Sequence, residues 1–148
     1  MRTGLLLCFL GAACASGPQL HPDLHGQAPE LLAAMREHAR NYHEPPGMYQ
    51  TFSVLGWPIW PYGIVVAIDG PMIGVRMKNP EQLPQHVEDL RMPISNPQKN
   101  ANRGDGIVAG RLGDVLICRF FPDEHHADGP PEIGDSAYLV TSMERLRR

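Results

Sequence analysis

One short segment carries the residue types that bind transition metals. It contains two carboxylates, Asp123 and Asp128, and two adjacent imidazoles, His125 and His126. Imidazole and carboxylate groups are common ligands of divalent transition metals, and such an ion can activate water for hydrolysis. However, the ligands of catalytic zinc usually stand at fixed offsets, such as i and i+4 on a helix, and this segment lacks that spacing. The segment therefore predicts either a solvated loop or a divalent-metal site.

A second segment combines aromatic residues with prolines. Trp57, Trp60 and Tyr62 are separated by Pro58 and Pro61, which stiffen the backbone. Exposed aromatic rings on a stiff backbone can stack against sugar rings or proline-rich peptides. If they are buried instead, the same rings would fill one end of a small barrel. The segment therefore predicts either a ligand-binding platform or a core plug.

No motif of a known catalytic centre accompanies these two segments. The sequence lacks the Gly-x-Ser-x-Gly, P-loop and Gly-x-Gly-x-x-Gly patterns of hydrolases and nucleotide-binding proteins. Cys118 lies in the apolar run 115–118 and is expected to be a buried, inert thiol. The sequence therefore favours a protein that is not an enzyme, with no catalytic residue. It also predicts no cofactor, unless residues 123–128 hold a divalent metal.

The start of the chain is typical of a secretory leader. Arg2 supplies a positive charge, residues 5–10 form an apolar run, and residues 11–15 are all small. The apolar run is shorter than the ~20 residues that a membrane-spanning helix needs. The sequence therefore predicts an exported protein whose signal peptide is removed.

Residues 10–14, Leu-Gly-Ala-Ala-Cys, resemble the lipobox of bacterial lipoproteins. The large aliphatic residue, Leu10, stands one place further from the cysteine than is usual. The resemblance implies a signal peptide over residues 1–13, cleavage before Cys14 and lipidation of that cysteine. Because Ala15 rather than an aspartate follows, it also implies an outer-membrane anchor facing the periplasm. The alternative is cleavage after Ala15, which would give a secreted or soluble periplasmic protein.

Length and composition bound the fold and the partners. A chain of 148 residues is enough for one domain, and 43% hydrophobic residues can build a core. The formal net charge of −3 and the pI of about 6.1 argue against a domain built to bind nucleic acid or anionic membrane surfaces. The 15 glycines and 15 prolines favour short elements joined by turns over a bundle of long helices.

Behind the leader, the sequence predicts a tether and one helix. Residues 14–28 contain prolines and glycines without periodicity, which indicates a flexible tether. A single globular domain is then expected over residues 29–148. Its helix should begin at Pro29 and end near Tyr42, ahead of Pro45, because apolar residues such as Leu31 and Met35 recur at helical spacing.

The remainder of the domain predicts a sheet. Apolar or β-branched runs indicate strands at residues 48–55, 63–69, 72–77, 107–110, 114–121 and 136–142. Residues 78–104 are polar, contain four prolines and predict a long loop. Five to six short strands with one N-terminal amphipathic helix predict an α+β, β-rich fold, either a small bent antiparallel sheet or a partly open barrel. OB-like and SH3-like barrels are comparable in their number of elements alone.

These observations together predict an exported cell-envelope lipoprotein with a non-catalytic binding or assembly role. Its partners would be the membrane, through the lipid on Cys14, and another envelope protein or a glycan. The alternative function is a metal-binding protein or metal-dependent hydrolase that uses residues 123–128.

Overall fold

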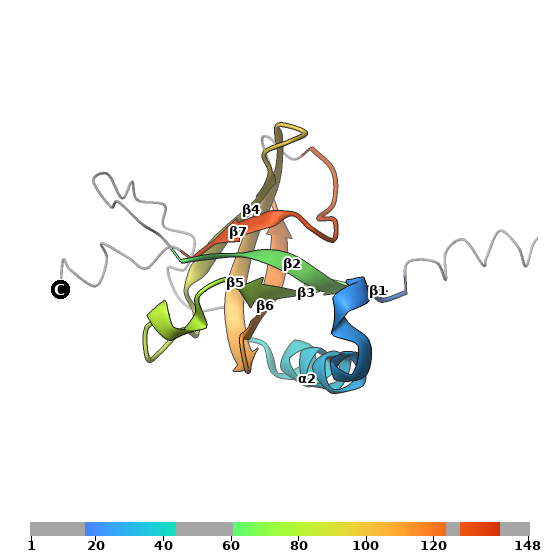
Figure 1. Ribbon diagram of the computed structural model, residues 1–148, viewed down its shortest axis with the longest axis vertical. Coiled ribbons are helices and arrows are strands. Elements are labelled where there is room, and N and C mark those ends of the chain that lie inside the picture. The colour runs from blue at the N-terminus through green and yellow to red at the C-terminus, as the bar shows by residue number, and fades with distance from the viewer. Residues whose placement is uncertain (1–16, 44–60, 124–127, 140–148) are drawn as a thin grey trace, which may run out of the picture.

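Six strands of the chain close into an antiparallel barrel, and one helix packs against its outer surface (Figure 1). The computed structural model describes residues 17–43, 61–123 and 128–139. In chain order the elements are β1 (Gln19–Leu20), the 3₁₀ helix η1 (Pro22–Gln27), α2 (Ala28–Asn41), β2 (Tyr62–Asp69), β3 (Met72–Met77), the 3₁₀ helix η2 (Pro80–Gln82), β4 (Arg91–Asn96), β5 (Ala101–Leu112), β6 (Val115–Pro122) and β7 (Ser136–Tyr138).

The strand order is β1-β2-β3-β6-β5-β4-β7, and a further pairing between β2 and β7 closes the barrel. Strands β4, β5 and β6 form a meander, and β3 lies beside β6, which is a Greek-key arrangement. Closure depends on the short strand β7, because Ala137 pairs with Gly63 of β2 on one side and with Ile94 of β4 on the other. Strand β1 adds to β2 outside the barrel.

Apolar side chains fill the interior of the barrel. This inner core includes Val65, Val75, Met92, Ile94 and Leu116, none of which is exposed to solvent. Because the side chains of a strand alternate between two faces, each strand sends every second side chain inward. The barrel is therefore a packed body in which side chains occupy the interior.

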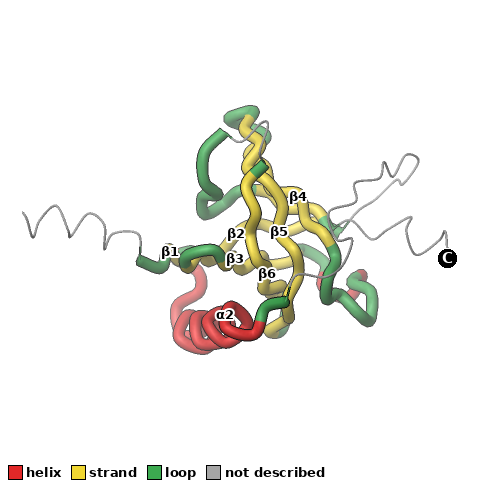
Figure 2. The backbone as a smooth tube through the Cα atoms, turned by 180° about the vertical axis from the view of Figure 1, so that it is seen from behind, coloured by secondary structure: helices red, strands yellow, loops and turns green. Residues whose placement is uncertain are grey.

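Helix α2 lies along the outside of the sheet (Figure 2), and a second, outer core fills the space between them. Leu31 and Met35 of α2 are buried against Val66 and Ala67 of β2. These two consecutive residues both belong to the outer core because a β-bulge interrupts the register between Val65 and Ala67. The bulge therefore lets one strand serve the inner core and the outer core.

The structure confirms the β-rich α+β class and the N-terminal helix, but the barrel is closed rather than partly open. The expected loop over residues 78–104 differs as well, since β4 and the start of β5 lie within it. In the expected tether, Gln19 and Leu20 form β1, and Leu24 of η1 is buried. The strand expected at residues 48–55 lies outside the described residues.

Candidate functional site

An exposed group of apolar side chains lies on the outer face where β2 meets β7. Tyr62 and Tyr138 stand opposite each other in the register, with ring centroids 5.9 Å apart and planes tilted by 39°. Ile64 follows two residues along β2 and therefore shares the outer face with Tyr62. The exposed fractions are 40% for Tyr62, 39% for Tyr138 and 37% for Ile64. We call these three residues the tyrosine surface.

Local sequence explains how β2 presents this surface. Val65 points into the inner core, so Tyr62 and Ile64 point outward on the alternating strand. Between them, Gly63 approaches the backbone of Arg76 on β3 so closely that a Cβ atom there would overlap it. The tyrosine surface therefore lies on a strand that packs closely against β3.

Of the predicted aromatic platform, the structure places Tyr62 at the surface, while Trp57 and Trp60 lie outside the described residues. Tyr138 is the partner that sequence reasoning missed. Its sequence separation from Tyr62 is large, and only the pairing of β2 with β7 brings the two rings together. Paired tyrosines with one exposed side have the chemistry to stack on a sugar ring or a flat peptide group.

The predicted metal segment is placed in part. Asp123 and Asp128 are described, and both carboxylates accept hydrogen bonds from Asn102: the Asn102 side-chain amide donates to Asp123 at 2.8 Å, and its backbone N–H donates to Asp128 at 2.9 Å. His125 and His126 lie outside the described residues. Across the described part of the chain, no three His, Cys, Asp or Glu side chains form a group that could hold a metal ion.

A buried ion pair near this segment was not predicted from the sequence. Arg103 and Asp135 are 4% and 0% exposed, and the Arg103 Nε–H donates to the Asp135 carboxylate at 3.0 Å. The remaining Arg103 donors bind the Asp128 carbonyl at 2.7 Å and the Glu132 carboxylate at 3.1 Å. A hydrogen bond from Lys99 lowers the pKa of Glu132. These hydrogen bonds and ion pairs connect the segment before β7 to β5.

A second ion pair lies on the outer surface of the barrel. Arg91 of β4 and Asp105 of β5 are 3.2 Å apart. Partial burial raises the pKa of Asp105; the positive charge of Arg91 opposes this shift, and the negative charge of Asp123 adds to it. The loss of water therefore outweighs the attraction to Arg91.

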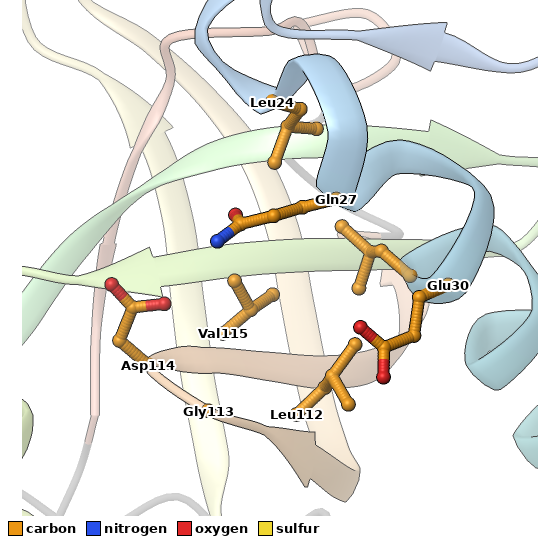
Figure 3. A pocket seen from close by; sticks show the side chains of 8 residues that line it. Leu24, Gln27, Glu30, Leu112, Gly113, Asp114 and Val115 are labelled. Atoms are coloured by element: carbon orange, nitrogen blue, oxygen red, sulfur yellow. The ribbon is translucent and has the colours of Figure 1, made fainter.

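The pocket in Figure 3 lies between η1, α2 and the turn that joins β5 to β6. Its lining residues are Leu24, Gln27, Glu30, Leu31, Leu112, Gly113, Asp114 and Val115. Its volume of about 170 Å³ is below the ~300 Å³ at which ligand pockets begin. Arg76 donates a hydrogen bond to the Gln27 side chain at 2.9 Å and lies 3.5 Å from Asp114, so these polar side chains already have partners within the protein. The pocket is too small for a substrate of ordinary size.

Cys118 is buried inside the barrel, as the sequence predicted, with its sulfur 3.7 Å from the Met92 sulfur. Burial raises the pKa of the Cys118 thiol, which keeps it protonated and unreactive. Among the described residues, no helix has the length and apolar character needed to cross a membrane.

Comparisons with models of known protein families, with curated proteins and with solved structures find no match to this chain.

Proposed function

We propose that this chain is an exported bacterial cell-envelope lipoprotein, acylated on Cys14, whose barrel has a binding or assembly role without catalysis. The observation that carries the proposal is the lipobox-like run at residues 10–14, behind a basic and apolar leader. The leading location is the periplasmic face of the outer membrane.

The barrel supports a role at the molecular surface. Its interior is filled by the inner core, so a ligand must bind outside. We assign this contact to the tyrosine surface, where Tyr62, Ile64 and Tyr138 remain accessible. The partner would be a glycan or another envelope protein, either of which can present flat groups to aromatic rings. The analogy to OB-like barrels, which bind ligands on an outer sheet surface, is part of this proposal.

The lipid anchor is tested by expressing the chain with its own leader in a bacterial host. Intact mass and membrane fractionation should give a membrane-bound chain that begins at Cys14 and carries acyl groups. Cys14→Ser should abolish both, whereas the control Cys8→Ser should leave both unchanged, because Cys8 is removed with the leader. A soluble, unmodified chain that begins at Ser16 would contradict the proposal.

The same acylated protein tests the tyrosine surface. We expect it to co-sediment with purified peptidoglycan or to cross-link to an envelope protein, and Tyr62→Ala with Tyr138→Ala should reduce that capture roughly tenfold. Glu37→Ala is the control, because Glu37 is an exposed residue of α2 outside this surface. Equal capture of all variants would exclude the surface as the contact region.

A further inference from the structure

The chain between the predicted acylation site and the folded domain is very short. Only Ala15 and Ser16 separate Cys14 from Gly17, the first described residue, and β1 begins at Gln19. An extended chain spans ~3.3–3.6 Å per residue, so the distance from Cys14 to Gln19 is at most about 18 Å. A lipid on Cys14 therefore keeps β1 close to the membrane surface.

Strand β1 is firmly attached to the barrel. Leu20 pairs with Ala67 in the register, and the His21 N–H donates to the Val66 carbonyl at 2.8 Å. Four residues after Leu20, the side chain of Leu24 is buried in the outer core. The segment cannot detach without losing these contacts. The limit on the distance from Cys14 therefore holds for the barrel as well as for β1.

The surface around β1 has residue types that occur at membrane interfaces. Leu20 is 36% exposed, and Pro71, in the turn between β2 and β3, is also exposed. Leu20 pairs with Ala67, four residues before Pro71. The Phe120 N–H donates to the Pro71 carbonyl at 2.7 Å, which brings the end of β6 to the same turn. There, separated from β1 by two strands, the half-buried Arg119 guanidinium lies 5.0 Å from the centroid of the half-buried Phe121 ring, which also lies 6.2 Å from the Tyr42 ring.

We call Leu20, Pro71, Arg119 and Phe121 the β1 end of the barrel. Aliphatic and aromatic side chains next to arginine are enriched where proteins contact the headgroup region of a bilayer. The composition of the β1 end and its short distance from Cys14 therefore both indicate this end as the one that faces the membrane.

We propose that the β1 end rests on the phospholipid headgroups of the leaflet that holds the Cys14 lipid; this inference depends on the proposed acylation. In both views η2 lies on the opposite side of the barrel from β1 (Figures 1 and 2). Tyr62 stands at the far end of β2 from the β2–β3 turn, about 20 Å away at the usual rise of a strand. The orientation therefore directs the tyrosine surface away from the membrane, toward soluble partners.

Fluorescence quenching tests this orientation in the full acylated chain. A thiol-reactive fluorophore is placed at Leu20→Cys, with Pro71→Cys as a second reporter at the β1 end and Gln82→Cys of η2 as the control. Cys118 is buried and Cys14 would be blocked by its lipid, so only the introduced thiol reacts. The protein is reconstituted into vesicles of phosphatidylethanolamine and phosphatidylglycerol that contain a headgroup-labelled quencher.

We expect quenching at positions 20 and 71 to exceed quenching at position 82 roughly twofold or more, since headgroup quenchers act over short distances at the interface. A flexible insert of twenty Gly and Ser residues after Ser16 should reduce this difference. If mass spectrometry confirms acylation but all three positions are quenched equally, the orientation is wrong and the lipoprotein proposal stands. If the chain is not acylated, both proposals fail.

Discussion

At the scale of single residues, Arg103 and Asp135 are the two charged side chains that are buried within the described part of the chain. Burying a charge costs free energy unless the charge is paired and hydrogen-bonded. Asp135 meets this condition, because its carboxylate accepts from the Arg103 side chain, the Asn96 side-chain amide at 3.0 Å and the Glu132 backbone at 2.8 Å. These bonds join β4, β5 and the segment before β7, where the barrel closes.

We expect Asp135→Asn to lower the free energy of unfolding by about 3 kcal/mol, because it removes the buried charged partner of Arg103 and leaves only the half-exposed Glu132 carboxylate to compensate the guanidinium. The control is Asp114→Asn, which removes a half-exposed partner of Arg76 and should cost less than about 1 kcal/mol. Urea unfolding monitored by circular dichroism measures both variants. Equal losses would show that the buried pair contributes no more than a surface pair.

At the scale of elements, α2 approaches the sheet over two glycines. Gly74 of β3 lies beneath Leu31, and Gly110 of β5 lies beneath the His38 ring. A Cβ atom at position 110 would overlap that ring, whereas one at position 74 would lie at 3.5 Å from Leu31, which is ordinary contact. The position of the His38 ring under the helix therefore depends on the missing side chain at Gly110.

We expect Gly110→Ala to destabilise the protein by about 1–3 kcal/mol, as overpacking does. In a His38→Ala background the same change should be neutral, because the space under the helix is then open. A double-mutant cycle from urea unfolding should give a coupling of about 1 kcal/mol or more. Additive effects of the two substitutions would contradict this account of helix packing.

At the scale of the whole molecule, one sheet separates two apolar cores. Ile94 belongs to the inner core and Met35 to the outer core, and both are completely buried. The inner core joins all six barrel strands through their inward faces, whereas the outer core holds only η1 and α2 against the sheet. The barrel is thus the unit on which the helix depends.

We expect Ile94→Ala to cost about 2–5 kcal/mol and to increase amide hydrogen exchange throughout the barrel. Met35→Ala removes a side chain of similar size, yet its increase in exchange should be confined to η1 and α2. Native-state hydrogen exchange distinguishes these patterns. Loss of protection in all strands of Met35→Ala would mean that the two cores unfold as one unit.

Much of the secondary structure followed from the sequence because its signals are local. The helix predicted from Pro29 to Tyr42 corresponds to α2 (Ala28–Asn41), since apolar periodicity and flanking prolines are enough to bound a helix. The strands predicted at residues 63–69 and 72–77 correspond to β2 and β3, since short apolar and β-branched runs indicate strands. The metal-binding hypothesis for His125 and His126 and the acylation of Cys14 remain predictions.

The tertiary structure alone decided how the barrel closes and which residues meet. Pro93 suggested a loop, but it occupies β4 next to a bulge, where the missing N–H of a proline is tolerated. Tyr62 and Tyr138, like Arg103 and Asp135, are distant in sequence and meet only through strand pairing. Local composition determines whether a segment becomes a helix or a strand. The partner of each strand depends on register and burial across the whole chain, which no single segment encodes.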